Sequence, residues 1–454
     1  TLASGGYEVD NSLRFNSGSS DYLNRTPSGA SSTKTKFTYN CWVKRSKLGT
    51  EQNLIEAGTS SNERTYLSLG VFGTDELSFV HRTGGSNAIV VTGTNLLRDV
   101  SAWYMITLKY DSTDGTANNR VRLFINNVEV AYTTQTMPSS NATTYINNNT
   151  AHFISKASHA GERYLDGYLS EVVMVDATAL NPDSFSEVDE DSGILKPISV
   201  SGLTFGTNGF YLDFEDSANL GNDANGGTDL TEVNLTAIDQ STDTCTTNFA
   251  TLNPLDNFYY NGTFTEGNLK IINGSGREAS ATATIAISNG KWFWEVQPKT
   301  NVAPFIGIQQ SPSAANTSSG ASMSTNGYGY LKTGKVETSN GSGGSTVLAT
   351  YATYAADDII GVAVDLDGNK IYFYKNGALQ GSGVTITAAS ATTNGHYFAG
   401  FGVLGGQDTF EVNFGSPPFA ISSGNQDGNG YGNFEYAVPS GYYALNTKNL
   451  AEYG

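Results

Sequence analysis

The stretch that decides the fold runs from Asp357 to Gln380 and reads DDIIGVAVDLDGNKIYFYKNGALQ. Apolar side chains recur at every second position over residues 360–366, and a second alternating run covers residues 371–374. A period of two residues predicts β-strands, because neighbouring side chains in a strand point to opposite faces. The dipeptides Asp367-Gly368 and Asn376-Gly377 favour tight turns between antiparallel strands. The stretch therefore predicts a three-stranded antiparallel meander.

The same pattern of short strands and turns recurs toward the N-terminus. Residues 103–110 alternate in the same way, and the runs 121–125 and 128–130 flank the pair Asn126-Asn127, which favours a hairpin turn. Helical periodicity is nearly absent, apart from residues 181–190, where we expect one or two helical turns that begin at Pro182. Many short strands joined by turns predict β-sandwiches, not alternating strands and helices.

A polar segment divides the chain into two parts. With 454 residues the chain is long enough for two domains. We expect an all-β fold of two antiparallel β-sandwich (jelly-roll) domains in tandem. The first covers residues 1–215 and the second residues 258–420, with a linker over residues 216–257 and a C-terminal extension over residues 421–454.

The composition limits the classes of partner. Asp and Glu number 43 against 25 Lys and Arg, which gives a formal net charge of −18. Nucleic acids and anionic membrane surfaces attract concentrated positive charge, so neither is expected as the main partner. No apolar run approaches the length of a membrane span, and the first ten residues predict no signal peptide. The two cysteines, Cys41 and Cys245, are too few for a disulfide framework, and we expect Cys41 to pack as a small core residue.

The sequence holds no pattern typical of catalysis, so we expect no enzyme, no catalytic residue and no cofactor. None of the four histidines has metal-ligand spacing, and the common motifs of hydrolases and nucleotide-binding enzymes are missing. Glycoside hydrolases use two carboxylates that face each other across a cleft. Asp213 and Glu215 alternate on one face without a partner acid, and Glu295 is expected to face solvent.

Two loops are candidates for ligand binding. Oxygen-rich residues 111–119 could coordinate Ca²⁺ through Asp111 and Asp114, although the same residues suit bare turns. Tyr328 and Tyr330 lie in a Gly- and Ser-rich region, residues 311–345, and could offer aromatic faces to a sugar. The alternative is that the two tyrosines pack this loop onto the sandwich.

The second half resembles the SPRY domain family. Four motifs carry this resemblance in the family's order: GKWFWEV at Gly290–Val296, Asp358–Asp367, YFYKNG at Tyr372–Gly377, and NFGSPPF at Asn413–Phe419. The resemblance implies a bent antiparallel sandwich whose loops bind protein partners.

The first half resembles laminin-G and concanavalin-A-like sandwiches. Six segments carry this resemblance: Ser12–Phe15 with Tyr22-Leu23, Phe37–Val43, Trp103–Tyr110, Val121–Val130, and Tyr164–Asp176 followed by the helical turn of residues 181–190. Phe210–Phe214 is expected to add one more strand to this sandwich.

Three further segments resemble virion proteins of marine bacteriophages, which often join a concanavalin-like sandwich to a SPRY-like one. They are the opening residues 1–16, Thr242–Leu255 and Pro439–Leu450. The resemblance implies a virion location and a tail fibre or tail-associated adhesin that binds a host surface glycan or protein through its loops. The implied partners are other virion proteins and copies of the chain itself, for instance in a trimer. A capsid or tail decoration protein, a bacterial surface lectin-like adhesin and a glycoside hydrolase remain as alternatives.

Overall fold

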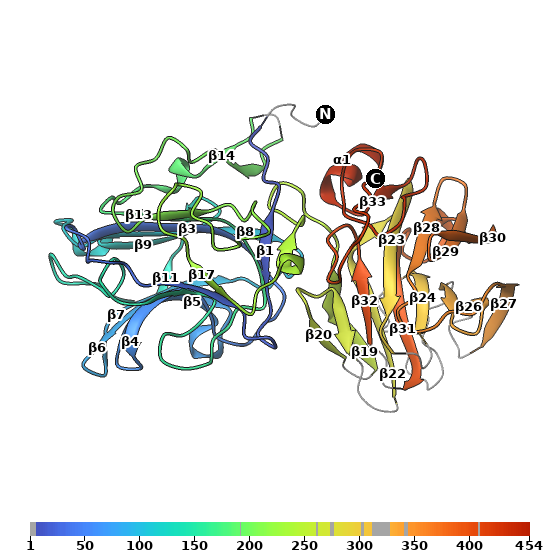
Figure 1. Cartoon of the computed structure of the whole chain (residues 1–454), viewed down its shortest axis with the longest axis horizontal. Helices are drawn as coiled ribbons and strands as arrows, with labels where there is room; N and C mark the ends of the chain where they lie inside the picture. Colours follow the sequence, from blue (N-terminus) through green and yellow to red (C-terminus); the bar gives the residue numbers. More distant parts are fainter. Residues whose placement is uncertain are drawn as a thin grey trace. The chain divides into compact units, whose positions relative to one another are not determined.

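The computed structural model describes residues 6–190, 192–259, 262–272, 277–300, 304–310, 327–339, 344–406 and 409–454. The chain divides into two compact units, a first unit of Ala3–Thr246 and a second unit of Thr247–Gly454. Each is built almost wholly from antiparallel strands (Figure 1). In the described part of the chain the one α-helix is α1 (Thr447–Tyr453). The predicted all-β fold of two tandem sandwiches is confirmed.

The first unit stacks two eight-stranded sheets face to face. The β3 sheet has the order β10 (Val128–Glu129), β9 (Val121–Ile125), β8 (Trp103–Asp111), β3 (Lys36–Arg45), β13 (Gly167–Asp176), β1 (Ser12–Phe15) and β18 (Gln240–Ser241), and β16 (Phe210–Leu212) also pairs with β13. The β5 sheet has the order β11 (Tyr132–Thr136), β7 (Ser86–Leu96), β6 (Glu76–Thr83), β5 (Glu63–Leu69), β4 (Gln52–Ser60), β12 (His152–Ile154), β2 (Tyr22–Arg25) and β17 (Thr231–Val233).

The main core of the first unit fills the space between its two sheets. Phe37 of β3 stacks on Tyr110 of β8 with ring centroids 4.8 Å apart, and Phe79 of β6 meets both rings from the facing sheet. Cys41 is fully buried in this core, as its apolar surroundings in the sequence predict. The strand expected at residues 210–214 is β16, which pairs with β13.

The outer face of the β3 sheet is also buried, which explains why every residue of β3 after Lys36 is buried. Trp42, Trp103 and Tyr168 pack there against Phe185 and other apolar side chains from the segment after β13. That segment begins with one 3-10 turn, η3 (Pro182–Ser184), which follows Asn181 as predicted. A two-stranded hairpin of β14 (Ser186–Val188) and β15 (Leu195–Pro197) replaces the second helical turn that we allowed for.

The predicted linker over residues 216–257 is not a separate segment. β17 pairs with β2 and β18 pairs with β1, so residues up to Thr246 belong to the first unit. Lys44 and Asp243 form an ion pair of 2.7 Å there, and both side chains are buried. Backbone hydrogen bonds, ion pairs and a few scattered apolar side chains, Leu220, Leu230 and Leu235, hold this segment, and for this reason its mainly polar composition resembled a linker.

The second unit also stacks two sheets. The seven-stranded sheet has the order β19 (Leu252–Tyr259), β22 (Arg277–Ile287), β31 (Tyr397–Gly406), β24 (Pro304–Gln309), β25 (Tyr328–Leu331), β26 (Lys335–Ser339) and β27 (Ser345–Thr350). The eight-stranded sheet has the order β20 (Thr263–Thr265), β21 (Lys270–Ile272), β32 (Thr409–Asn413), β23 (Lys291–Pro298), β28 (Ile360–Asp365), β29 (Lys370–Lys375) and β30 (Ala378–Thr385), and β33 (Tyr443–Ala444) runs parallel to β23.

The predicted meander is confirmed as β28, β29 and β30. Lys375 pairs with Ala378, so Asn376 and Gly377 form a two-residue turn, with φ of 47° and 78°. Both central residues of this turn type need positive φ, which Asn and Gly tolerate best. Asn126 and Asn127 form the same turn in the first unit, with φ of 51° and 66°.

The C-terminal extension covers the outer face of the eight-stranded sheet, and this corrects the expected position of Glu295. The Glu295 side chain is fully buried, because residues 434–436 lie over it. Its carboxylate accepts hydrogen bonds from the backbone N–H groups of Glu435 (3.0 Å) and Tyr436 (2.8 Å) and from Asn413 Nδ2 (3.1 Å). Phe293 packs beside it on Phe434 at a centroid distance of 5.3 Å. A strand face that we expected to meet solvent is therefore an internal surface.

We predict that Glu295→Ala loosens the C-terminal extension. The substitution leaves three buried N–H donors without an acceptor, and each unsatisfied donor costs about 1–3 kcal/mol. The free energy of unfolding of the second unit should fall by roughly 3 kcal/mol, and residues 421–454 should become sensitive to limited proteolysis, followed by mass spectrometry.

Glu452→Ala is the matched control, because Glu452 lies on the same extension with an exposed side chain. Equal protease resistance of the Glu295→Ala and Glu452→Ala proteins would show that Glu295 does not hold the extension.

Candidate functional site

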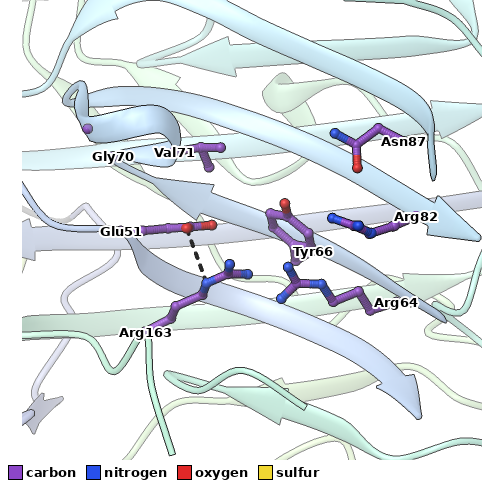
Figure 2. Close-up of a pocket in the computed structure, with 9 residues that line it drawn as sticks. Glu51, Arg64, Tyr66, Gly70, Val71, Arg82, Asn87 and Arg163 are labelled. Carbon is purple, nitrogen blue, oxygen red and sulfur yellow. Dashed lines mark ion pairs between the residues drawn. The ribbon is translucent and has the colours of Figure 1, made fainter. Parts of the chain in front are cut away.

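A polar pocket opens on the outer face of the β5 sheet. Side chains alternate along β5, so Leu67 enters the main core while Tyr66 faces outward, beside Val80 and Val90. Polar side chains on the same outward face line the pocket floor: Arg64 and Tyr66 from β5, Arg82 from β6 and Asn87 from β7 (Figure 2). Because they stand on hydrogen-bonded strands above a packed core, these side chains start from fixed backbone positions.

Three loops form the walls of the pocket. Gly70, Val71 and Gly73 come from the 3-10 turn η1 (Val71–Gly73) and its preceding residue, and Glu51 and Arg163 come from loops at the other side. The cavity measures about 390 Å³, which is within the range of small-ligand sites. Gly70 has φ of 78°, and a Cβ there would lie 2.3 Å from the carbonyl oxygen of Thr50, so this wall requires glycine.

Tyr66 lies close to two guanidinium groups, those of Arg64 and Arg163, in the pocket (Figure 2). The Cζ atoms of Arg64 and Arg163 are 4.7 Å and 5.4 Å from its ring centroid. Burial, followed by the charge of Glu51, raises the pKa of Tyr66, so the phenol stays neutral. Its hydroxyl makes no hydrogen bond to a described residue and is available to a ligand. The cation–π contacts hold the ring and the two arginines in one arrangement.

The arginines are only partly neutralised by carboxylates. Arg163 Nε lies 3.1 Å from Glu51 Oε2, and Arg64 Nη1 lies 3.7 Å from Glu56 Oε2. Arg82 Nη2 donates to the carbonyl oxygen of Gly85 at 2.8 Å, and within the described residues it forms no ion pair. Arg163 Nε also lies 3.6 Å from Glu162 Oε1, so three carboxylates pair with Arg64 and Arg163, and Arg82 alone has no carboxylate partner among the described residues.

Several buried polar atoms around the pocket lack a partner. Arg64 Nε, Arg82 Nε, Arg163 Nη1 and Glu51 Oε1 form no hydrogen bond within the described part of the protein. Burial raises the pKa of Glu51, against the opposing effect of Arg163. Leaving a buried donor or acceptor unpaired is costly, so solvent or a ligand is needed to satisfy these atoms. The pocket thus offers three donors and one acceptor to a bound molecule.

A second, smaller pocket in the first unit is less suited to a ligand. It measures about 160 Å³ and is lined by Arg25, Asn208 and neighbouring loop residues. Arg25 already donates to the carbonyl oxygens of Thr228 (2.8 Å) and Asn208 (2.6 Å), so its guanidinium serves to close these loops.

A buried carboxyl group lies on the outer face of the β3 sheet. Glu171 occupies a β-bulge of β13 with φ of 50°, and its side chain is only 4% exposed. Tyr211 donates to its carboxylate at 2.9 Å and Tyr7 donates at 3.3 Å. Burial, together with the smaller effect of the nearby acids Asp213 and Glu215, raises the pKa of Glu171 to about 7. The arrangement can store a proton near neutral pH.

We predict that Glu171 makes the first unit less stable as pH rises. The folded protein binds the proton of Glu171 more tightly than the unfolded chain does. The stabilisation that this proton gives is therefore complete below the ordinary pKa of glutamate and is lost as pH rises through about 7. From about pH 5 to about pH 8, the free energy of unfolding should fall by roughly 3 kcal/mol from this group. Denaturant unfolding at a series of pH values measures the slope.

Glu171→Gln should remove this part of the pH dependence, because glutamine resembles the protonated acid at every pH. Glu190→Gln, at an exposed turn position, is the control and should keep the wild-type slope. A Glu171→Gln protein whose stability falls as steeply as the wild type would contradict the assignment.

The structure corrects the expected position of Tyr328 and Tyr330. Both lie in β25 with 6% and 0% of their surface exposed. Tyr330 donates to the carbonyl oxygen of Ala352, and the Tyr328 hydroxyl accepts from Thr387 N at 2.9 Å. They alternate with glycines, and Gly329 leaves room for the ring of Phe305, so both tyrosines point into the core. Of the two alternatives, inward packing of both tyrosines agrees with the structure, and an exposed aromatic face does not. Residues 311–326 and 340–343 of the same region lie outside the described residues.

Asp111 and Asp114 stabilise turns in the structure. Asp111 accepts from Thr113 N at 3.0 Å and pairs with Lys36 at 3.1 Å, and Asp114 accepts from Thr116 N at 2.8 Å. No group of three or more His, Cys, Asp or Glu side chains that could hold a metal occurs among the described residues. Calcium binding at these two aspartates stays a prediction.

Sequence reasoning missed the pocket on the β5 sheet. Its signal was the alternation in β5, which reads ERTYLSL and places Arg64 and Tyr66 on the face opposite Leu67. The contributions of Arg82 and Arg163 required the pairing of β5 with β6 and the path of a loop about 100 residues away.

Two family models match the sequence. Residues 17–184 match the model described as the concanavalin A-like lectin/glucanases superfamily, and residues 291–417 match the SPRY domain. Every residue that lines the larger pocket falls within the first match. The comparison with curated proteins finds no match. In the described part of the chain, no helix is long and apolar enough to cross a membrane.

Solved structures with a similar fold include three of different kinds. The SPRY domain of human HERC1 is 14% identical, with 36% of this chain and 96% of that chain covered and a TM-score of 0.29. A putative carbohydrate binding protein from Bacteroides ovatus is 17% identical, with 50% and 58% covered and a TM-score of 0.34. Tailspike protein 2 from an Escherichia coli O157:H7 bacteriophage is 13% identical, with 38% and 23% covered and a TM-score of 0.29. This chain therefore spans less than two thirds of the last two proteins.

Proposed function

We propose that this chain, which carries a concanavalin-A-like domain followed by a SPRY domain, is a non-catalytic recognition protein that binds carbohydrate through the pocket on the β5 sheet. One observation carries the proposal: unpaired buried donors of three arginines, with the free Tyr66 hydroxyl, line a single cavity of about 390 Å³. Saccharides are rich in hydroxyl groups that accept and donate hydrogen bonds, and a few fixed polar groups in a cavity are enough to orient them.

The lining supports binding more than bond cleavage. Glycoside hydrolysis needs two carboxyl groups across a cleft, one of which must exchange a proton with the substrate. Glu51 is the one carboxylate among the lining residues, and it pairs with Arg163. The described residues give this pocket no second acid to act opposite Glu51.

We predict that Arg82→Ala weakens glycan binding at least tenfold. A hydrogen bond to a charged group contributes about 1.5–3 kcal/mol, and a tenfold loss corresponds to about 1.4 kcal/mol. Arg82 has no carboxylate partner among the described residues, so its removal leaves no buried anion unpaired. An array of bacterial surface polysaccharides identifies ligands, and calorimetry with the full chain measures their affinity.

Arg122→Ala is the matched control, because Arg122 lies on β9 of the opposite sheet and pairs with Glu129. An equal loss of glycan affinity in the Arg82→Ala and Arg122→Ala proteins, or no loss in either, would exclude the pocket as the binding site. Release of reducing sugar from a bound glycan would contradict the non-catalytic assignment.

We further propose that the chain is a bacteriophage virion protein, acting as a tail fibre or tail-associated adhesin that contacts other virion proteins and copies of itself. The segments Thr242–Leu255 and Pro439–Leu450, which resemble phage virion proteins, support this setting, together with the two recognition folds in tandem. The stiff sandwiches suit an exposed particle, because loops on rigid scaffolds can contact a host surface without loss of order. We propose no resident cofactor.

The virion setting predicts that antibodies raised against the chain label intact particles at the tail. Immunogold electron microscopy of purified particles measures this, with antibodies against a major capsid protein as control. Even labelling of the whole capsid would indicate a decoration protein instead, and labelling of uninfected bacterial cells would indicate a bacterial surface adhesin.

A further inference from the structure

The arginine pairing across β5 and β6 points to the chemical class of the ligand. We infer that the pocket binds an acidic saccharide, one whose carboxylate or sulfate group is held by Arg64, Arg82 and Arg163. The inference rests on the proposed function and adds the charge of the ligand to it. Arg64 and Arg82 are direct cross-strand partners in the register of the two strands. Like charges directly opposite each other destabilise a sheet.

The acidic composition of the whole chain makes a cluster of three arginines unusual. The chain has 25 Lys and Arg against 43 Asp and Glu, and three of those few cations gather at one pocket. Arg64 is only 4% exposed, and burying a cation is costly unless it is paired. Three carboxylates, those of Glu51, Glu56 and Glu162, pair with Arg64 and Arg163, and Arg82 has none among the described residues. The guanidinium group of Arg82 therefore has no anion beside it among the described residues, and the acidic group of a ligand can take that place.

The unpaired atoms match the acceptors of an acidic group. Arg64 Nε, Arg82 Nε and Arg163 Nη1 are donors that only an acceptor can satisfy. Carboxylate and sulfate groups present several acceptor oxygens, and charge-assisted hydrogen bonds to guanidinium groups are about twice as strong as neutral ones. A neutral sugar would satisfy the donors and leave the charge of Arg82 without an ion pair.

One unpaired atom indicates a saccharide as opposed to a bare inorganic anion. Glu51 Oε1 is an acceptor that lacks a donor, and the neighbouring phenol hydroxyl of Tyr66 is free. A sugar hydroxyl can donate to the first and pair with the second, whereas sulfate has no hydroxyl group to donate to a carboxylate in this way. Donors for an acid group and an acceptor for a hydroxyl group therefore lie in one cavity.

Calorimetry of the full chain with three probes tests the inference: an oligogalacturonate, an unsubstituted galactan oligosaccharide of equal length, and a sulfated galactan oligosaccharide. We expect at least one acidic probe to bind at least tenfold more tightly than the neutral one. The stronger acidic probe shows whether carboxylate or sulfate is the preferred group. Inorganic sulfate, as a fourth probe, should bind more weakly than either acidic saccharide.

Arg82 variants separate charge from shape. Arg82→Gln should remove the preference for the acidic probes, Arg82→Lys should keep part of it, and Arg122→Gln should keep all of it. Circular dichroism establishes that each variant is folded. If the neutral and acidic probes bind equally and Arg82→Gln loses this binding, the inference is wrong, whereas the proposed function still holds. Binding of none of the saccharides would overturn both, and inorganic sulfate binding as tightly as the acidic saccharides would indicate a simple anion site.

Discussion

The alternation of side chains along the strands of the β5 sheet is the constraint on which the pocket depends. A strand can contribute to the core with every second residue, and the intervening residues must face the other way. In β5 this places Leu67 between the two sheets and Arg64 and Tyr66 on the outer face. The core contacts fix the register, and a shift of one residue would bury the arginines and expose the leucines. The pocket therefore has the stability of the sandwich beneath it.

The outer faces of the sheets differ in what covers them. The outer face of the β3 sheet is covered by apolar side chains around Trp42 and Phe185, and in the second unit the C-terminal extension covers Phe293 and Glu295. On the β5 sheet, the loops that carry Glu51, Val71 and Arg163 form walls around the floor and leave a cavity. A sheet face that keeps buried, unpaired polar atoms in place of an apolar cover gives up stability, and such sites in proteins are commonly functional.

Local features of the fold could be predicted from the sequence, and features that depend on distant segments could not. The turns at Asn126-Asn127 and Asn376-Gly377 follow from the residues themselves, because positive φ is a local requirement. Glu295 was expected in solvent because its cover lies 140 residues further along the chain. Tyr328 and Tyr330 were expected in a loop because the glycines beside them resemble loop composition, whereas Gly329 makes room for the Phe305 ring. The pocket could not be predicted for the same reason, since Arg64 and Arg163 are almost 100 residues apart in the sequence.

The charge of the whole chain and the charge of the pocket act on a ligand in opposite directions. A formal charge of −18 repels polyanions from the general surface, so an acidic polysaccharide gains little from non-specific contact. At the pocket the guanidinium groups lie within a few ångströms of Tyr66, at a range where their attraction exceeds the screened repulsion of distant carboxylates. Discrimination then rests on whether an acidic group reaches the three arginines. A recognition protein that has to select one acidic glycan among many anionic polymers needs this combination of general repulsion and local attraction.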